Sequence, residues 1–536
     1  MNVECLAISA VPGLSRLFLD YCSGQTVVRP WYGAMPRDRS WQRTQHQESN
    51  THRDQLARVL AGQNSSASLA DAIERIRQGA NVVVTGQQVG LFGGPAFTPY
   101  KAATAVALAQ EASAAGHVHL PVFWLASEDH DLAEVNHVTF PARRELTRLT
   151  YQAAPAAAVP VGGVVLDKSI TPLIDQAWEL LGYSDAMEWL AAAYRPGQTL
   201  AGAFAEFYGK VFSSQGLLIL DAAGRDVHQL GAPVLQAAIE RADELHEALL
   251  ERNKDLAAAG YHAQVAVADR GSLLFLLDEQ TGARVALRRT AANAAEPDGL
   301  WQAGRQTYST DELLGILANA PERISPSALL RPVFQDEILP TSAYIGGPAE
   351  IAYFAQSAVL YERILGRLTP VLPRLSVTLV EPAIAEVLDR HELTAESIFH
   401  STEQGLAQQL GARAIPIEGK QKLASAGNAL DVELTALTEY MGALDEGLGK
   451  SALVSASKMR YQMNRLRRMA ANFQLQKEAS LNRHAQALTQ ALYPHGELQE
   501  RLIGAGYFLA KYGEGLVEKL VAEAADGCPG HKVIRL

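Results

Sequence analysis

Residues 82–95, with the sequence VVVTGQQVGLFGGP, constrain the fold of this chain more than any other segment. Three β-branched residues lead into a glycine-rich turn, and a helical pattern that carries Lys101 follows it. A buried strand, a glycine turn and the start of a helix are how an α/β protein presents backbone N–H groups to an anion. The spacing matches neither Gly-x-Gly-x-x-Gly nor the P-loop pattern. A tight turn that binds nothing therefore remains the alternative.

Two further apolar runs resemble the strand at 82–85. Residues 121–126 (PVFWLA) and 216–221 (GLLILD) are almost free of polar side chains. Continuous apolar runs are typical of strands that are covered on both faces, as in a parallel sheet with crossover helices. An alanine-rich helical pattern at 100–115 lies between the first two runs and completes a βαβ unit. The sequence therefore predicts an α/β fold with a parallel-sheet core.

A polar turn follows the second predicted strand directly. It contains Glu128, Asp129, His130 and Asp131. Because the carboxyl ends of parallel strands share one sheet edge, we expect this turn to lie beside the glycine turn, in the ligand crevice. His130 is the main candidate for a general base or a phosphate contact, and the carboxylates around it favour its cationic form. A histidine that only supports the fold is the alternative.

A third polar segment begins at Arg331 and ends in a second Gly-Gly-Pro turn. An acidic residue and a helical pattern follow that turn, which repeats the arrangement at 93–95. The two turns could frame one crevice, or their similarity could be chance. Arg331 suits a bidentate grip on a carboxylate or a phosphate, with a salt bridge to Asp336 or Glu337 as the structural alternative.

The composition argues against two classes of protein, nucleic-acid-binding proteins and membrane-spanning proteins. The net charge of −11 argues against general nucleic-acid binding, and no apolar window approaches the roughly 18 residues of a membrane span. Three cysteines, Cys5, Cys22 and Cys528, make a disulfide framework improbable and suit a reducing cytoplasm. Cys5 and Cys22 lie among apolar residues, so we expect them to be buried and inert.

The last third of the chain changes character after residue 380. Leucines and methionines between 434 and 473 recur at steps of three and four, which predicts a long helix with a heptad seam. We expect this arm to pair two chains, with an intramolecular helical hairpin as the alternative. The predicted organisation comprises core segments at 1–140, 205–227 and 326–380, insertions at 141–204 and 228–325, a helical coiled-coil arm at 381–485, and a C-terminal helix with an edge strand at 486–536.

Several segments together resemble one known family. They are GQQVGLFGGP at 86–95, EDHD at 128–131 with EVNH at 134–137, the run from Arg331-Pro332 to AYIGGPAEI at 343–351, PRLS at 373–376, and Tyr493-Pro494 with LQER at 498–501. In this order they are similar to the bacillithiol biosynthesis cysteine-adding enzyme family. The resemblance covers essentially the whole chain.

The resemblance implies a Rossmann-like core with connecting-peptide insertions and a coiled-coil domain that forms a homodimer. It implies a cytoplasmic ligase that joins cysteine to the amine of glucosaminyl-malate, the last step of bacillithiol synthesis. ATP would activate the cysteine carboxylate, and Mg²⁺ could accompany the nucleotide. A nucleotidyl- or glycosyl-transferase on the same fold, or a non-catalytic dimeric carrier of the intermediate, are the alternatives.

The expected site residues divide into two groups. We expect catalysis at His130, Asp129 and Asp131, with no protein metal site. The expected substrate- or nucleotide-binding residues are Gly86, Gln87, Gln88, Gly90, Pro95, Lys101, Glu128, His137, Arg331, Gln335, Tyr344, Gly346, Gly347 and Glu350. For Lys101, the alternative is an ordinary solvated lysine.

Overall fold

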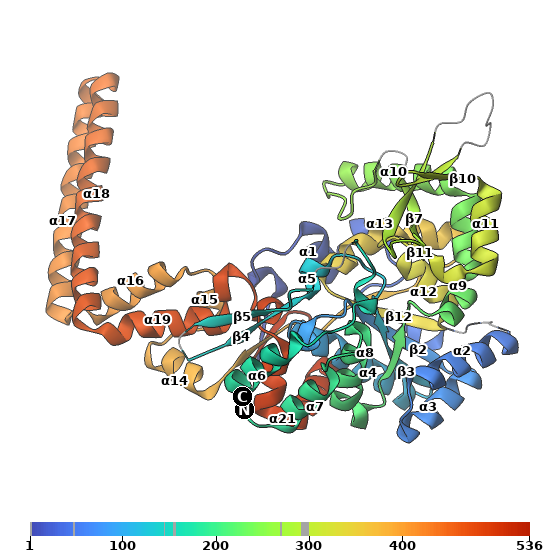
Figure 1. Ribbon diagram of the computed structural model, residues 1–536. Helices are drawn as coiled ribbons and strands as arrows, with labels where there is room; N and C mark the ends of the chain where they lie inside the picture. The colour runs from blue at the N-terminus through green and yellow to red at the C-terminus, as the bar shows by residue number, and fades with distance from the viewer. Residues whose placement is uncertain are drawn as a thin grey trace. The chain divides into compact units, whose positions relative to one another are not determined.

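The computed structural model describes residues 3–44, 46, 49–143, 145–153, 157–268, 271–290 and 300–536 (Figure 1). The chain forms two compact units. The larger unit contains residues 4–377 and 500–532. The smaller unit contains residues 378–499, together with Val3 and residues 533–536.

The larger unit is built on a five-stranded sheet with the order β13-β12-β2-β3-β6. Its strands are β2 (Asn81–Gln87), β3 (His119–Leu125), β6 (Leu218–Asp221), β12 (Thr341–Gly346) and β13 (Val371–Pro373). Every neighbouring pair is parallel, and Val84 lies opposite both Val122 and Tyr344. The α/β fold with a parallel-sheet core that the apolar runs predict is confirmed, and its topology agrees with the Rossmann-like core that the resemblance implies.

Both faces of this sheet are buried, which explains the uninterrupted apolar strands. Val82 and Val84 pack in one hydrophobic cluster, whereas Val83 packs in another with Ala105 and Ala109 of α4 (Phe97–Ala114). The alanines allow α4 to lie close to the sheet. The chain runs from β2 through β3 to β6 and then adds β12 on the other side of β2, so the strand order reverses between β2 and β12. In α/β sheets this reversal point is where ligands bind.

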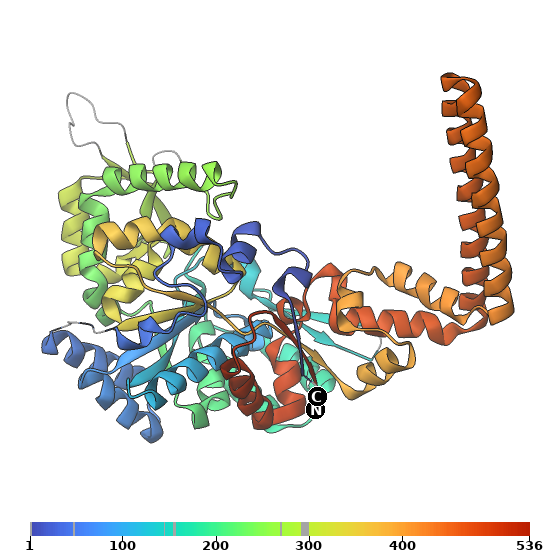
Figure 2. The same ribbon diagram turned by 180° about the vertical axis from the view of Figure 1, so that it is seen from behind.

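The first 93 residues contain several short elements besides β2, and buried residues among them pack in the same hydrophobic cluster as Val82 and Val84. They are β1 (Val3–Leu6), α1 (Arg16–Cys22), α2 (Asn50–Gln63) and α3 (Ala67–Arg77), with short 3₁₀ helices η1 (Ile8–Ala10), η2 (Thr26–Trp31), η3 (Ser40–Arg43) and η4 (Leu91–Gly93). Figure 2 shows α2 and α3, in blue, on the flank of the larger unit.

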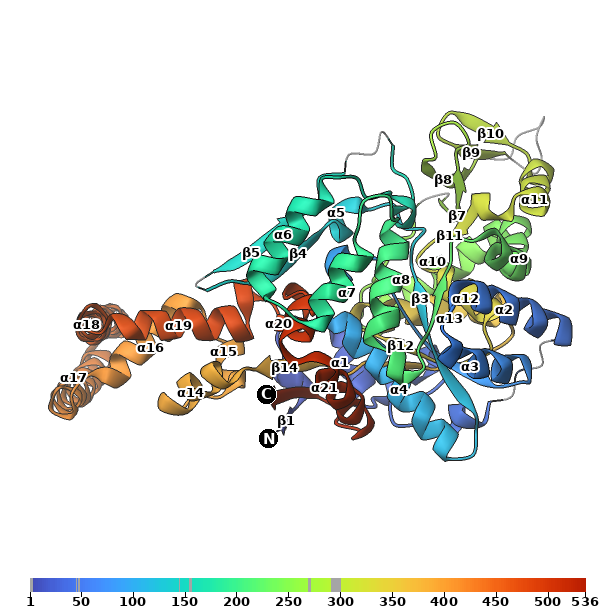
Figure 3. The same ribbon diagram turned by 60° about the horizontal axis from the view of Figure 1, so that its bottom comes forward.

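The first insertion follows β3 (Figure 3). It contains α5 (Leu132–Val135), the antiparallel pair β4 (His137–Pro141) and β5 (Leu146–Thr150), and the helices η5 (Val161–Gly163), α6 (Ile170–Leu181), α7 (Asp185–Ala193) and α8 (Leu200–Val211), with η6 (Ser213–Gln215) leading to β6.

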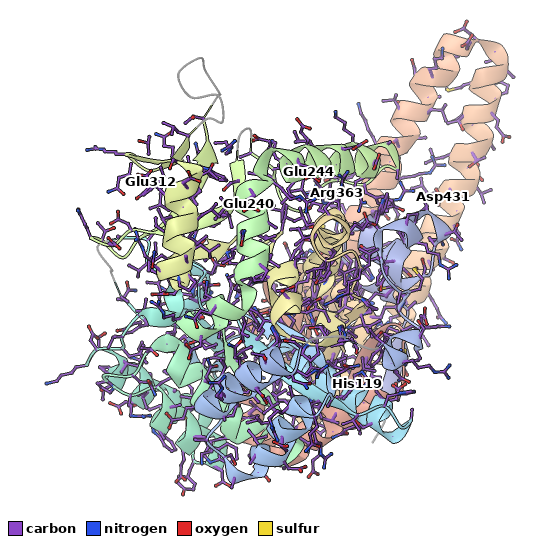
Figure 4. The ribbon with its side chains drawn as sticks, turned by 90° about the vertical axis from the view of Figure 1, so that its right-hand side faces the viewer. His119, Glu240, Glu244, Glu312, Arg363 and Asp431 are labelled. Carbon is purple, nitrogen blue, oxygen red and sulfur yellow. A yellow bond between two sulfur atoms is a disulfide. The ribbon has the colours of Figure 1, made fainter. Side chains whose placement is uncertain are left out.

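The second insertion carries a separate antiparallel sheet with the order β10-β9-β8-β7-β11. Its elements are α9 (Arg225–Glu240), α10 (Ala242–Ala258), β7 (Gly271–Leu277), β8 (Arg284–Arg289), β9 (Trp301–Ala303), β10 (Gln306–Tyr308), α11 (Thr310–Asn319), η7 (Pro321–Arg323) and β11 (Ile324–Pro326). The chain then returns to the core with α12 (Arg331–Ile338) and α13 (Pro348–Ile364). Glu244 of α10 and Arg363 of α13, both labelled in Figure 4, form an ion pair of 3.1 Å.

The smaller unit is helical, but its long helices differ from the prediction. It contains α14 (Pro382–Arg390), α15 (Ala395–Phe399), α16 (Glu403–Ala414), α17 (Ile417–Leu444), α18 (Glu446–Lys477) and α19 (Ala479–Leu492). The expected continuous helix through 434–473 is wrong, because the chain reverses at Asp445 and α17 packs against α18 (Figure 1). The Asp445 side chain accepts a hydrogen bond from the N–H of Leu448 at 2.8 Å and begins α18.

The glycines near this reversal have a packing role. A Cβ on Gly449 would lie 2.7 Å from the Cα of Gly442, so the two helices approach closely where they meet. The heptad steps continue across the turn, so the pattern alone predicts one long helix. The structure instead shows an intramolecular helical hairpin.

The remaining elements are β14 (Val377–Val380), which precedes the helices of the smaller unit, and the C-terminal η8 (Pro494–Gly496), α20 (Gln499–Leu502), α21 (Ala505–Ala525) and β15 (His531–Arg535). The predicted edge strand at the C-terminus exists as β15, but it is not a strand of the five-stranded core sheet.

Two cysteine predictions are wrong. Cys5 and Cys528 form a disulfide, and Cys5 is exposed rather than buried. The two residues are 523 positions apart, so no local pattern could have shown their proximity. Cys22 is half-buried with a free thiol, and burial raises its pKa to about 12. Across the described helices, none is long and apolar enough to cross a membrane.

Candidate active site

A buried ion pair occupies the point where the strand order of the core sheet reverses. The Lys101 ammonium group, on α4, lies 2.5 Å from the Glu350 carboxylate in the first turn of α13. Lys101 also donates hydrogen bonds to the carbonyl of Gly86 and, at 3.1 Å, to Oε1 of Gln87 at the end of β2. Its side chain is 1% exposed, so it is not the solvated lysine of the structural alternative.

Glu350 holds the second Gly-Gly-Pro turn. Its carboxylate accepts hydrogen bonds from the Tyr344 hydroxyl at 2.6 Å and from the N–H of Gly347 at 2.8 Å. Burial raises the pKa of Glu350, but the charge and hydrogen bond of Lys101 outweigh burial and lower it. Burial lowers the pKa of Lys101, and Glu350 opposes that shift. The ends of β2 and β12 are therefore tied together through one charged pair.

The glycine turn after β2 is braced by the protein itself. The Tyr194 hydroxyl accepts from the N–H of Gly93 at 2.9 Å and donates to the carbonyl of Gly90 at 2.8 Å. The N–H groups of Gly90 and Gly94 donate to backbone carbonyls within the turn. A Cβ on Gly90 would lie 2.8 Å from the Cα of Gly94, which explains why glycine is needed there. These three amides are satisfied inside the protein and do not form the open anion cradle that the motif predicted.

The polar turn after β3 is held by the turn after β2. Gln88 donates to Asp129 at 2.7 Å and to Glu134 at 2.8 Å. Burial raises the pKa of Asp129, but the hydrogen bonds from Gln88 and from the backbone N–H of His130, with nearby arginines, lower it overall. Asp129 is therefore an anion in the crevice. The Asp131 carboxylate instead accepts from the N–H of Ala133 and begins α5.

His130 lies between an arginine and a carboxylate. Its Nδ1 atom is 3.3 Å from Nη1 of Arg284 and 3.7 Å from Oδ1 of Asp129. Because a guanidinium only donates hydrogen bonds, Nδ1 can act only as an acceptor toward Arg284.

Arg284, the first residue of β8, is held in place by other residues of the second insertion. Its Nε atom donates to the Ser325 hydroxyl at 3.0 Å and Nη2 donates to the carbonyl of Pro326 at 2.7 Å. The guanidinium carbon lies 3.8 Å from the centre of the Phe275 ring, in a cation–π contact. Burial lowers the pKa of Arg284, which is opposed by Glu128 and Asp129.

Glu128 and Arg331 each have a partner that the sequence did not suggest. Glu128 pairs with Nε2 of His228, a fully buried residue of α9, at 2.8 Å. Burial lowers the pKa of His228, but the charge and hydrogen bond of Glu128 outweigh burial and raise it. Arg331 donates to the Tyr353 hydroxyl at 2.8 Å rather than to the nearby acids.

These groups line a cavity of about 360 Å³. Its charged and imidazole groups come from Glu128, Asp129, His130, His246, Arg284, Arg288 and Arg331, and apolar residues of the second insertion form much of the remaining wall. Trp124 and Ser327 also line the cavity, and their indole N–H and hydroxyl groups are buried without a hydrogen-bond partner. The three guanidinium groups fit an anionic, oxygen-rich ligand such as a carboxylate or a phosphate.

The remaining predicted residues do not line this cavity. Nδ1 of His137, at the start of β4, is 3.1 Å from the carbonyl of Ala133, and burial lowers the pKa of His137. Gln335 is buried in α12 and donates to Asp336 at 3.3 Å. Pro95 pairs with Gly504 in a backbone bridge, and Gly346 ends β12. Within the described ranges no group of three or more His, Cys, Asp or Glu residues could hold a metal ion.

Sequence reasoning missed several residues of this site. Arg284 and Phe275 lie in an insertion far along the chain, and no local pattern marks them. Asp221 ends β6 on the same sheet edge and accepts a hydrogen bond from Ser127, while burial raises its pKa. Its position after a buried strand was a usable signal.

Comparisons with known proteins agree with this architecture. The family model described as the N-terminal Rossmann-like domain of bacillithiol biosynthesis BshC matches residues 1–375, and the C-terminal coiled-coil domain of the same family matches residues 377–536. A relative from Koribacter versatilis is 41% identical and one from Solibacter usitatus is 33% identical, each across the full length of both chains. A relative from Salinibacter ruber is 32% identical over 98% of this chain and 97% of its own. All three carry the name "Putative cysteine ligase BshC". The chain therefore belongs to the BshC family of bacillithiol biosynthesis proteins.

Proposed function

We propose that this chain is a ligase that forms an amide bond between the carboxyl group of cysteine and the amine of glucosaminyl-malate, which completes bacillithiol. The observation that carries the proposal is the cavity at the carboxyl edge of the sheet, which three arginines line together with carboxylates and imidazoles. The names of the full-length relatives support the ligase class.

The charges of the cavity suit these two substrates. The guanidinium groups of Arg284 and Arg331 can hold the malyl carboxylates. The anionic Asp129 can hold an ammonium group beside them. Holding both reactants in one cavity reduces the entropic part of the barrier.

His130 can accept the proton that the amine must lose before it attacks. While Nδ1 is unprotonated, it accepts a hydrogen bond from Arg284 at 3.3 Å. Once it is protonated, repulsion from Arg284 and attraction to Asp129, 3.7 Å away, favour a shift toward the carboxylate. Lys101 and Glu350 keep the two turns in place behind these groups.

A carboxylate does not form an amide without activation, so we propose ATP, accompanied by Mg²⁺, as a co-substrate. Release of AMP would indicate an acyl-adenylate, and release of ADP an acyl-phosphate. We further propose that the protein acts in the cytoplasm and that two chains pair through the helical arm, where large apolar side chains of α17 and α18 are exposed.

Reconstitution tests the proposal. The purified chain is incubated with glucosaminyl-malate, cysteine, ATP and Mg²⁺, and the thiol and nucleotide products are measured by mass spectrometry. We expect bacillithiol and one nucleotide product in equal amounts. Turnover of a nucleotide sugar or release of pyrophosphate without cysteine would favour a transferase, and binding of glucosaminyl-malate without product would favour a carrier.

The His130→Ala variant tests whether the reaction takes place in this cavity. We expect it to abolish thiol formation while the circular dichroism spectrum and the sedimentation coefficient stay unchanged. His262→Ala, which replaces an exposed histidine outside the cavity, is the matched control. Normal thiol production by the His130 variant would overturn the assignment of this site.

A further inference from the structure

The Cys5–Cys528 disulfide joins the first strand to the segment before the last strand. Cys5 lies in β1, and Cys528 lies between the end of α21 and the start of β15. The bond closes a loop with a sequence separation of 523 residues, nearly the whole chain. Figures 1 and 2 show the two marked chain ends near each other.

The two sulfur atoms have different surroundings. Cys5 is exposed, whereas Cys528 is half-buried. The Sγ atom of Cys528 accepts a hydrogen bond from the N–H of Gly530 at 3.4 Å. A hydrogen bond to sulfur stabilises the thiolate form, which makes Cys528 the better leaving group when the bond is attacked.

The segment around Cys528 has anchors other than the disulfide. The Asp526 carboxylate accepts from the N–H of Cys528 at 2.9 Å and pairs with the buried Lys532 at 2.6 Å. Lys532 also pairs with Glu523 at 2.6 Å. Because these contacts do not involve sulfur, the segment can keep its conformation when the disulfide opens.

We propose that the Cys5–Cys528 pair is a thiol-exchange site, at which a small-molecule thiolate attacks the exposed sulfur of Cys5 and Cys528 leaves as a thiolate. A bond forms between the incoming sulfur and Cys5, and the bond between Cys5 and Cys528 breaks. A second thiolate then attacks the mixed disulfide, which releases the oxidised small molecule and leaves two cysteine thiols. A small-molecule disulfide reverses the sequence by the same two exchanges.

This site is independent of the ligase proposal, because neither cysteine lines the cavity. In a reducing compartment, the ratio of reduced to oxidised small thiols would set the fraction of chains that are closed. The covalent state of the chain ends would then report the thiol state of the surroundings.

The test uses the oxidised full-length chain and cysteine as the probe thiol. Samples are acid-quenched at intervals, free thiols are alkylated, and the peptides that contain each cysteine are analysed by mass spectrometry. We expect the transient mixed disulfide on Cys5 to exceed that on Cys528 by at least about tenfold. With excess cysteine, both Cys5 and Cys528 should become free thiols that can be alkylated. Addition of cystine should form the Cys5–Cys528 disulfide again.

Two single variants compare the reactivity of Cys5 with that of Cys528. Cys528→Ser keeps an exposed Cys5, which should take up cystine as a stable mixed disulfide, whereas in Cys5→Ser the half-buried Cys528 should react much more slowly. Cys22 is the internal control and should stay unmodified. A disulfide that resists excess cysteine in the folded protein, or mixed disulfides formed mainly at Cys528, would overturn the proposal.

Discussion

The ammonium group of Lys101 lies 2.5 Å from the carboxylate of Glu350 at the reversal point of the sheet, with the Lys101 side chain 1% and the Glu350 side chain 16% exposed. Lys101 extends from α4, the helix after β2, and Glu350 lies in the first turn of α13, the helix after β12. The pair therefore joins the two strand ends that frame the crevice. The pair does not line the cavity, but it holds Gly86 and Gly347 at the ends of the two strands.

Replacing Lys101 with methionine should destabilise the protein strongly. Glu350 would then be a buried carboxylate without its cation, and loss of one partner of a buried pair costs about 3–5 kcal/mol. Urea unfolding followed by circular dichroism measures the change. The double variant Lys101→Met/Glu350→Gln should recover part of the loss. Lys422→Met, which removes an exposed ion pair of α17, should change little. Equal effects of Lys101→Met and Lys422→Met would contradict this account.

Arg284→Gln should reduce kcat/KM by roughly 10²-fold, because a preorganised cationic donor in an enclosed site contributes this much to catalysis. Arg284→Lys should recover little of the activity, since lysine cannot keep the fork that reaches Ser325, Pro326 and His130 together. Steady-state kinetics measure both variants. Arg305→Gln, an exposed arginine of the same insertion, should retain full activity.

Stability should fall in acid through Glu500. Its carboxylate is buried in a bidentate pair with Arg374 at 2.7 and 3.0 Å, and although burial raises the pKa, Arg374 lowers it overall. A lowered folded pKa stabilises the protein above the unfolded pKa of about 4.3, and this contribution is lost as pH falls through the folded value. The free energy of unfolding, measured from pH 7 to pH 3, should therefore fall less in Glu500→Gln than in the wild type. Parallel curves for the two proteins would exclude this role.

The helical hairpin offers a matched pair of glycines. Gly449→Ala would place a methyl group 2.7 Å from the Cα of Gly442, whereas a Cβ on Gly442 meets no atom within 4 Å. We expect Gly449→Ala to loosen the turn and to speed proteolysis near Asp445. Gly442→Ala should leave the rate unchanged. Limited proteolysis with mass spectrometry compares the two variants.

Pairing of two chains through the arm should depend on its exposed apolar side chains. Leu453 and Val454 of α18 are 57% and 59% exposed in the single chain. Glutamate at both positions should convert a dimer to a monomer in sedimentation velocity. Val165→Glu, an exposed apolar position of the larger unit, should not change the sedimentation coefficient. A dimer that survives both arm substitutions would place the interface elsewhere.

Much of the core could be predicted because its signals are local. Val82–Val84 and the run at 121–126 are apolar without interruption, and this indicated a parallel sheet buried on both faces before any contact was known. The positions of Asp129 and Glu350 after predicted strands likewise placed them at the carboxyl edge of the sheet.

Other features depend on contacts between distant segments, which periodicity does not encode. Heptad steps are the same whether a helix continues or folds back, so only the turn at Asp445 showed that the arm is a hairpin. The pairing of Cys5 with Cys528 required the two ends of the chain to meet.

The sequence by itself determined where the strands end and which polar residues follow them. The tertiary structure decided what those residues do, because it supplied their partners: Glu350 for Lys101, Arg284 for His130 and His228 for Glu128. Charge state and hydrogen-bonding role follow from burial and neighbours, and both are set by the fold as a whole.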